Sequence, residues 1–195
     1  MITMNATLRQ GLVGLRLLIV MTIVLGIAYP VMIFLVGRIV PGVSDGSYVT
    51  NSSGQVVGSA MIGQDFSGDR WFWPRPSAAG DGYDALSSGG SNLAADNPTL
   101  VSAVAERQAA IAVAEKVATA QIPADAVTAS GSGLDPDISP DYATLQVARV
   151  SAARGLDAVE VRRLVDTMTT GRFLGFIGEP RVNVLQLNLA LEGLG

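Results

Sequence analysis

Cysteine and histidine are both missing from this chain of 195 residues. Without cysteine no disulfide can form, so the fold depends on the packing of its core. Zinc sites built from Cys or His are excluded, and so are Ser-His-Asp and Cys-His catalytic groups. Lysine is almost missing too, because Lys116 is the only one and no Gly-Lys-Ser or Gly-Lys-Thr phosphate loop occurs. The sequence therefore predicts no catalytic residues and no bound metal, and the chain is poorly equipped to act as an enzyme alone.

Only one long apolar run is present, from Leu17 to Gly37, and it carries no charge. As a helix it extends about 31 Å, which matches the hydrocarbon core of a bilayer. A secretory signal peptide has a shorter apolar core, of about 7–15 residues, and ends in a small-x-small cleavage site that this run lacks. We therefore expect an uncleaved transmembrane helix. Pro30 predicts a kink, and the small residues Gly26 and Ala28 allow a second helix to approach, although a plain lipid anchor fits the pattern as well.

The charges around this run are distributed unevenly. Arg9 and Arg16 precede it, Arg38 follows it, and all 17 acidic residues lie after residue 40. Because basic residues tend to stay inside, the N-terminus is predicted to be cytoplasmic and the rest of the chain extracytoplasmic. Ten of the 13 basic residues also follow residue 40, so that part has a net charge of −7. Such an acidic domain is a poor partner for nucleic acid.

The patterns along the chain predict a single transmembrane helix followed by one soluble α+β domain. The expected parts are a short tail over residues 1–16, the transmembrane helix over 17–37, a linker over 38–54 and the soluble domain over 55–195. Helix starts are marked by a cap residue before proline at Asn97-Pro98 and Ser139-Pro140, and by Asp157. The elements expected in the domain are a strand within 55–63, a long loop over 74–98, helices over 99–120, 140–154 and 157–169, and an alternating strand over 181–191.

The first of three loop motifs, residues 71–80, holds both tryptophans of the chain. Aromatic rings beside an arginine are typical of protein interfaces, so Trp71, Trp73 and Arg75 are candidate contacts with a partner. Pro30 is a further candidate within the membrane. The alternative is that the rings belong to the core and that Arg75 stabilises the loop.

The other two motifs are rich in glycine and serine. Residues 86–92 can surround a phosphate with backbone N–H groups and hydroxyls, although no lysine is near and such Ser-Gly loops are more often plain structural turns. The candidate nucleotide contacts are Ser88, Gly89, Gly90, Ser91 and Asn92. Residues 128–140 offer the carboxylates of Asp135, Asp137 and Asp141 to a cation. Their spacing is not that of an EF-hand, and such residues more often cap the next helix.

The order of the motifs is more specific than any one of them. After the N-terminal apolar helix come Gly58-Ser59-x-x-Ile62-Gly63-Gln64, Arg75-Pro76-Ser77-Ala78, Ser88-Gly89-Gly90-Ser91-Asn92, Thr128-Ala129-Ser130-Gly131-Ser132-Gly133-Leu134-Asp135-Pro136 and Val182-Asn183-Val184-Leu185. Over nearly its whole length the chain resembles the C subunits of bacterial Kdp potassium-transporting ATPases.

The resemblance implies a bacterial plasma-membrane protein in a complex with a channel-like A subunit, an ATP-hydrolysing P-type B subunit and a small F subunit. It implies a non-catalytic subunit that is needed for assembly. The family is also described as a catalytic chaperone that raises the ATP affinity of the B subunit, which would make the 88–92 loop the nucleotide contact. No tightly bound cofactor is then expected, only ATP shared with the B subunit. The chain lacks the Asp-Lys-Thr-Gly motif of P-type pumps, in agreement with a non-catalytic role.

The predicted topology conflicts with a role in binding ATP, because an extracytoplasmic domain cannot reach cytoplasmic nucleotide. The alternative role is an extracytoplasmic cap on the channel-like subunit that concentrates or gates potassium at its entrance. Any such enrichment would be local, since charges are screened over about 8 Å at physiological salt. A cytoplasmic nucleotide-binding regulator and an extracytoplasmic cap are therefore two competing hypotheses.

Overall fold

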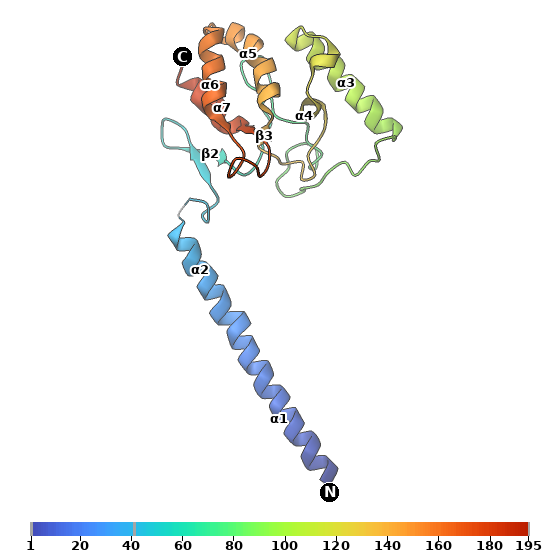
Figure 1. Ribbon diagram of the computed structural model, residues 1–195, viewed down its shortest axis with the longest axis vertical. Coiled ribbons are helices and arrows are strands. Elements are labelled where there is room, and N and C mark those ends of the chain that lie inside the picture. The colour runs from blue at the N-terminus through green and yellow to red at the C-terminus, as the bar shows by residue number, and fades with distance from the viewer. Residues whose placement is uncertain (1, 41, 195) are drawn as a thin grey trace. The chain divides into compact units, whose positions relative to one another are not determined.

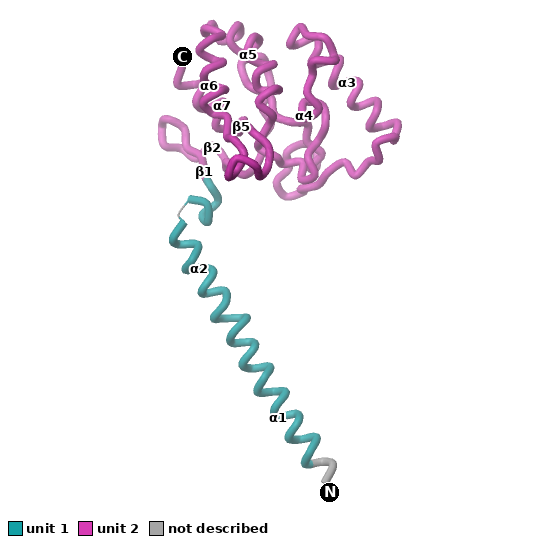
Figure 2. The backbone as a smooth tube through the Cα atoms, in the orientation of Figure 1, with its two compact units in different colours: residues 1–47 teal, residues 48–195 magenta. Residues whose placement is uncertain are grey.

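The computed structural model describes residues 2–40 and 42–194. The chain divides into two compact units, residues 1–47 and 48–195 (Figure 2). The first unit is almost entirely helical, and the second has an α+β fold (Figure 1). The predicted fold class, an apolar N-terminal helix and one α+β domain, is confirmed.

Unit 1 is built from α1 (Ile2–Ile23), a π-helical turn (Val24–Ala28) and α2 (Tyr29–Ile39). The Tyr29 N–H donates to the carbonyl of Val24, five residues back, just before Pro30. Such a widened turn accommodates a proline, which cannot donate to the ladder and clashes with the carbonyl four residues earlier.

The helical stretch from Asn5 to Ile39 is long and apolar enough to cross a membrane, and none of its most apolar window is buried within the chain. Residues 5–16, predicted as part of a tail, are thus helical as well. The bounds 17–37 for the membrane segment stay a prediction. Just after the helix, the Ser44 hydroxyl donates to the carbonyl of Gly37 at 2.8 Å and closes the chain back on the helix end.

Unit 2 contains two small antiparallel sheets. The first is a hairpin of β1 (Tyr48–Thr50) and β2 (Val56–Ser59). The strand expected within 55–63 is therefore present, while β1 lies inside the stretch predicted as linker. The second sheet has the order β3-β5-β4. Its strands are β3 (Asp137–Ile138), β5 (Arg181–Asn183) and β4 (Thr169–Thr170).

The helices of unit 2 follow the start signals in the sequence. They are α3 (Pro98–Glu115), the 3-10 turn η2 (Thr119–Gln121), α4 (Ala124–Val127), α5 (Pro140–Arg154), α6 (Ala158–Met168) and α7 (Val184–Glu192). Asn97, Ser139 and Asp157 cap α3, α5 and α6 through side-chain oxygens that accept backbone N–H groups. α5 ends at Gly155, whose φ of 69° is left-handed, as its sequence predicts.

Two predicted elements need correction. The helix expected over 99–120 ends at Glu115, because Lys116 takes a left-handed conformation with φ of 56° and caps α3. The strand expected over 181–191 is wrong beyond Asn183, where α7 begins. The Asn183 side chain accepts the N–H of Gln186 and starts the helix. The alternating leucines of this segment also satisfy helical spacing, because Val184, Leu187, Asn188 and Leu191 share its buried face.

The core lies where α5, α6 and α7 meet the three-stranded sheet. Figure 1 shows these three helices together on one side of unit 2, with α3 on the other side and α4 between them. Val182 on the central strand β5 is fully buried. The largest fully buried apolar side chains are Tyr142, Phe72, Leu187, Leu191, Val150, Val161 and Val165. Residues 60–97 form neither helix nor strand, as predicted for 74–98, so their position depends on contacts made at long range.

Candidate functional site

The three loop motifs of the sequence meet in unit 2. We call their meeting point the loop junction and define it by residues 75–79, 88–90 and 131–135. The Ser77 hydroxyl donates to the carbonyl of Gly133 at 2.7 Å. The carbonyl of Ser132 accepts both the Gly89 N–H at 2.8 Å and the Ser88 hydroxyl at 3.0 Å. The motifs that the sequence presents separately therefore form one hydrogen-bonded structure.

Glycine is required where the loops of the junction approach most closely. Gly133 has a φ of +67°, and a Cβ there would lie 2.6 Å from both the Ala79 nitrogen and the Gly89 oxygen. Gly63 donates its N–H to Leu134, and a Cβ on Gly63 would lie 2.6 Å from the carbonyl oxygen of Asp135. Real Cβ atoms do not approach backbone atoms so closely, so a side chain at either position would force the loops apart.

An ion pair fixes the outer side of the junction. Arg75 Nη1 lies 2.9 Å from Asp135 Oδ2, and the two side chains are 23% and 30% exposed. Arg75 also contacts the carbonyl of Thr128 at 3.4 Å. The Tyr83 hydroxyl donates to the carbonyl of Arg75. Burial raises the pKa of Tyr83, and the nearby Asp65 raises it further, so the phenol stays a neutral donor.

The predicted nucleotide contacts are placed on the edge of this junction. Ser88 and Gly89 already donate to Ser132, as described above, and Gly90 packs closely against Gly131. Ser91 and Asn92 are exposed, with Asn92 in a left-handed conformation at φ of 50°. α3 begins only at Pro98, so the loop does not lie at a helix N-terminus. Two of the donors that a phosphate would need are thus engaged in holding the loops together, and nucleotide binding stays a prediction.

Neighbouring this junction is the aromatic segment, which we define as residues 68–73. It has no regular secondary structure, and polar side chains of α5 and α7 hold its backbone. Asn188 accepts the Phe72 N–H at 2.9 Å and donates to the Phe72 carbonyl at 3.0 Å. Gln146 accepts the Trp73 N–H at 2.6 Å and donates to its carbonyl at 3.2 Å. The two amide side chains therefore replace the partner strand that a sheet would provide.

The tryptophan rings of the aromatic segment lie against arginines. The guanidinium of Arg149 lies 3.8 Å from the centre of the Trp73 ring, and that of Arg154 lies 4.5 Å from Trp71. Cation–π contacts of this kind stabilise both partners and fix the ring orientation. Both rings are half-buried, so they belong partly to the fold and keep part of their surface exposed. Their predicted role as partner contacts, with Arg75 and Pro30, stays a prediction.

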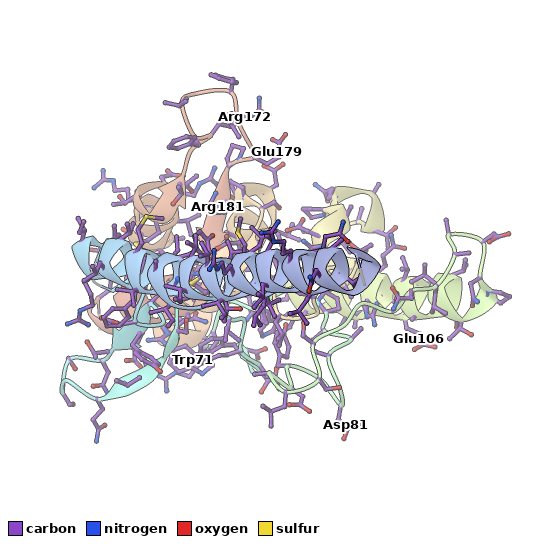
Figure 3. All side chains as sticks on the ribbon, turned by 90° about the horizontal axis from the view of Figure 1, so that it is seen from below. Trp71, Asp81, Glu106, Arg172, Glu179 and Arg181 are labelled. Carbon is purple, nitrogen blue, oxygen red and sulfur yellow. The ribbon has the colours of Figure 1, made fainter. Side chains whose placement is uncertain are left out.

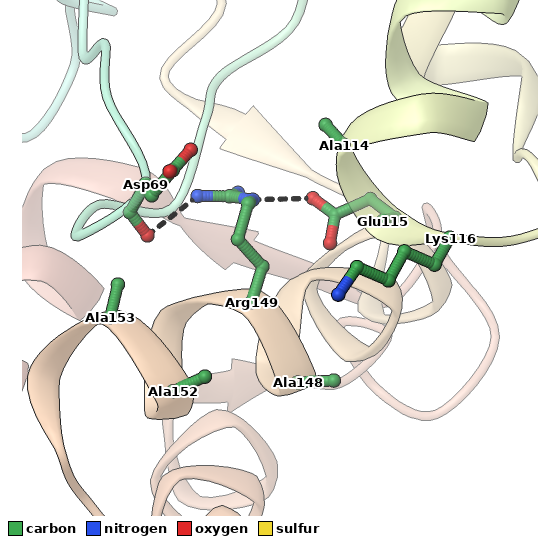
Figure 4. Close-up of a pocket in the computed structure, with 8 residues that line it drawn as sticks. All are labelled: Asp69, Ala114, Glu115, Lys116, Ala148, Arg149, Ala152 and Ala153. Carbon is green, nitrogen blue, oxygen red and sulfur yellow. Dashed lines mark hydrogen bonds and ion pairs between the residues drawn. The ribbon is translucent and has the colours of Figure 1, made fainter.

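A buried ion pair between Arg149 and Glu115 helps to hold the aromatic segment in place. Arg149 Nε lies 2.7 Å from Glu115 Oε1, and the two side chains are only 6% and 0% exposed (Figure 4). Arg149 Nη1 also donates to the carbonyls of Asp69 at 2.8 Å and Trp71 at 3.0 Å. One guanidinium therefore joins the end of α3, the middle of α5 and the aromatic segment.

Burial raises the pKa of Glu115, while the hydrogen bond and charge of Arg149 lower it, and burial dominates. Its second oxygen, Oε2, is buried without a hydrogen-bond partner among the residues that the structure describes. The pair lines a half-open pocket of about 470 Å³ together with Lys116 and small side chains of α5 (Figure 4).

Asp135 and Asp137 of the third motif serve the fold, and so does Asp125 just before it. Asp125 accepts both the N–H and the hydroxyl of Ser139, which in turn caps α5. Asp137 lies 2.9 Å from Arg181, and burial raises its pKa more than this arginine lowers it. Within residues 2–40 and 42–194, no group of three or more acidic residues is arranged to hold a metal ion. Asp125 therefore positions the start of α5, and Asp137 pairs with the start of β5.

Sequence reasoning missed the residues that hold the aromatic segment: Glu115, Gln146, Arg149 and Asn188. A signal was available for two of them. Gln146 lies among the apolar residues of one face of α5, and Asn188 lies among the leucines of α7. A polar residue on an apolar helix face is costly unless it is hydrogen-bonded, so it indicates a buried partner without saying which.

Comparisons with known proteins agree over nearly the whole chain. The family model described as KdpC, K+-transporting ATPase, c chain, matches residues 12–193. A potassium-transporting ATPase KdpC subunit from Kineococcus radiotolerans is 57% identical over 185 residues, which cover 95% of this chain and 94% of the relative. The subunit of the same name from Beijerinckia indica is 54% identical over 176 residues, with 90% and 89% covered. That from Mycobacterium tuberculosis is 49% identical over 187 residues, with 95% and 99% covered.

Proposed function

The chain belongs to the KdpC family of K+-transporting ATPase subunits. We propose that it stabilises the assembled potassium-uptake complex from the extracytoplasmic side of the membrane. In this proposal the folded unit docks on the extracytoplasmic face of the channel-like A subunit. The B subunit hydrolyses ATP, and the small F subunit completes the complex. The coarser statement, an accessory subunit of the potassium-transporting ATPase, follows from the family itself.

The distribution of charge around the anchor supports the extracytoplasmic side and is the observation that carries the proposal. Arg9 and Arg16 precede the uncharged run Leu17–Gly37, while all 17 acidic residues follow residue 40. Positive charge tends to remain in the cytoplasm, so the short basic segment is the part retained there. The acidic domain then faces the side from which potassium enters, where its negative potential raises the local cation concentration within about one Debye length.

The rigidity of the aromatic segment supports a docking role. Trp71 and Trp73 are half-buried and are oriented by Arg154 and Arg149, so their exposed edges are fixed before any partner binds. Rings that are held in place lose little conformational freedom on association, which favours tight binding. Arg75, held by Asp135, lies on the adjoining loop and adds a charged contact.

A second candidate function is the family's role as a catalytic chaperone for ATP binding. It is favoured by the exposure of Ser91 and Asn92 at the end of the glycine-rich loop. The two roles require opposite sides of the membrane, because ATP is cytoplasmic. Only the chaperone role requires Ser91 and Asn92 to contact ATP, so substituting these two residues distinguishes the two roles.

The test measures the ATP concentration for half-maximal hydrolysis by the whole complex. It compares the unchanged subunit with a Ser91→Ala/Asn92→Gly variant, since glycine retains the left-handed backbone of Asn92. Our proposal predicts a change of less than about twofold, because neither side chain contacts nucleotide. A rise of tenfold or more, with assembly intact, would contradict it and support the chaperone role. Ser77→Ala is the control, because it removes a hydrogen bond of the loop junction and lies outside the candidate nucleotide contacts at residues 88–92.

A further inference from the structure

The loop between β4 and β5, residues 171–180, presents four large apolar side chains to solvent. Phe173, Leu174 and Phe176 are 69%, 70% and 72% exposed, and Ile177 is 49% exposed. Single exposed apolar residues are normal, but four within five positions form a continuous apolar tip, and such patches mark contact surfaces. No function described above uses this loop.

The loop is a small hairpin with a polar base. Phe173 and Ile177 form an antiparallel bridge, and Gly175 at the turn has a φ of 82°. At the base, Arg172 Nη2 lies 2.7 Å from Glu179 Oε2. Figure 3 shows Arg172 and Glu179 on the strands of a loop that projects away from the neighbouring helices. A charged pair therefore lies at the base while the tip is apolar.

The backbone of the tip satisfies its own hydrogen bonds. Phe173 and Ile177 each donate to the other's carbonyl at 2.9 Å. Gly175 donates to Arg172 at 3.0 Å, and Phe176 donates to Phe173 at 3.3 Å. Four of the five N–H groups from 173 to 177 are thus engaged within the loop. This matters because an unpaired N–H costs several kcal/mol where no water can reach it.

We infer that the β4–β5 loop inserts its apolar tip into the interfacial region of the bilayer that anchors the chain. Apolar side chains at the tip, charges at the base and an internally bonded backbone are together what that region of a membrane requires. The loop projects from unit 2 (Figure 3), so it is suited to entering a soft apolar layer.

The connection between the anchor and the folded unit is short. Eight residues, 40–47, separate the end of α2 from the start of β1, and they span at most about 28 Å. A folded unit of this length has a radius of gyration of about 15 Å, so the connection is short enough for its surface to reach the lipid headgroups. The hairpin of β1 and β2, which follows this connection, also carries exposed apolar side chains, Tyr48 at 68% and Val56 at 60%. This inference does not rest on which side of the membrane the domain occupies.

The charges predict how this contact responds to lipid and salt. The part of the chain after residue 40 has a net charge of −7, and Arg172 at the loop base is already paired. Anionic lipid therefore offers no general electrostatic attraction, and burial of the four apolar side chains must drive insertion. The contact should form on zwitterionic bilayers and persist at high salt.

The absence of cysteine gives a direct experiment, because a single introduced cysteine is the only labelling site. Full-length Leu174→Cys carries an environment-sensitive fluorophore and is reconstituted in phosphatidylcholine nanodiscs, with or without doxyl-labelled lipid. The matched control is Val113→Cys on α3, where the side chain is 80% exposed. We expect a blue-shifted probe at 174 whose quenching by doxyl lipid is roughly threefold or more that at 113. Replacing Phe173 and Phe176 by serine should abolish that quenching.

Each other result would overturn the inference. Equal emission and quenching at positions 174 and 113 would show that the loop stays in water. A blue shift at 174 without lipid quenching would show that a second copy of the chain covers the loop instead. Quenching that appears only with phosphatidylglycerol, or is lost in high salt, would make charge the driving force. A blue shift that requires the other subunits would make the loop a protein interface.

Discussion

The aromatic segment and the β4–β5 loop both lack long regular structure, yet their backbones are held in opposite ways. Residues 68–73 depend on side chains from distant helices, chiefly Gln146, Arg149 and Asn188. The loop after Thr170 bonds mainly to itself and exposes apolar side chains. A segment tied to the core by buried polar groups is part of the scaffold. A segment whose backbone hydrogen bonds are made internally can present its side chains to an external partner.

The largest predicted effect breaks the buried ion pair beneath the aromatic segment. Arg149→Met leaves Glu115 buried without its partner and frees two backbone carbonyls, so the free energy of unfolding should fall by about 3–5 kcal/mol. Denaturant unfolding of the full chain in detergent measures it, with Trp71 and Trp73 as fluorescent reporters. Arg162→Met is the control, because the Arg162–Asp166 pair is 51% and 65% exposed. A loss no greater than that of the control would contradict the account.

The next effect concerns one amide on α7. Asn188→Ala removes both bonds to Phe72 and leaves a buried N–H and carbonyl unpaired, which should cost about 2–4 kcal/mol. Gln186→Ala changes an exposed amide on the same helix and should cost little. Hydrogen exchange at the Phe72 amide gives an independent measurement. Protection that survives Asn188→Ala would mean that other contacts hold the segment.

A glycine pair tests whether the loop junction resembles the aromatic segment in being part of the scaffold. Gly133→Ala combines a left-handed backbone with contacts of 2.6 Å to backbone atoms, and should destabilise unit 2 by about 2–3 kcal/mol. Gly131→Ala, two residues earlier, meets nothing within 4 Å and should be tolerated. Thermal unfolding of both variants distinguishes them. Equal midpoints would show that the junction is looser than the structure indicates.

The pH dependence of stability should follow Glu115. Its folded pKa is raised, so the folded state binds this proton more tightly than the unfolded state does. The contribution of Glu115 to the free energy of unfolding is therefore fully present below the ordinary pKa of glutamate, and is lost as pH rises through the raised folded pKa. Glu115→Gln should remove that fall. Parallel curves for the variant and the unchanged chain would show that Glu115 does not titrate in this way.

The smallest effect on stability is expected in the β4–β5 loop. Phe173→Ser with Phe176→Ser removes apolar side chains that touch little of the fold, so unfolding should change by less than about 0.5 kcal/mol. Circular dichroism and denaturant unfolding check it. A large loss would place the loop with the aromatic segment, as scaffold rather than contact surface.

The sequence was informative wherever a signal is local. Caps followed by proline predicted the starts of α3 and α5, and Asp157 predicted α6. The strand expected over 181–191 was wrong because alternating leucines fit both periods. There the decisive signal was the cap Asn183, which was read as part of the alternation. α3 ends early because Lys116 adopts a left-handed backbone conformation, which a lysine in the sequence does not indicate.

The candidate site was predictable in its parts but not in its assembly. The three loop motifs and the residues Trp71, Trp73 and Arg75 were recognised, yet nothing local indicates that Ser77 bonds to Gly133. The partners of the aromatic segment lie more than seventy residues away along the chain. The β4–β5 loop carried no motif and became visible only as exposed surface.

The central claim is that the folded unit lies on the extracytoplasmic side of the membrane. Chemical labelling of intact cells from the outside tests it. Single cysteines at Val113 in the folded unit and at Asn5, twelve residues before the uncharged run Leu17–Gly37, are treated with a membrane-impermeant maleimide. The account predicts labelling of Val113→Cys in intact cells, and of Asn5→Cys only after permeabilisation. The reverse pattern would contradict it, place the domain with cytoplasmic ATP and restore the loop of Ser91 and Asn92 as a nucleotide contact.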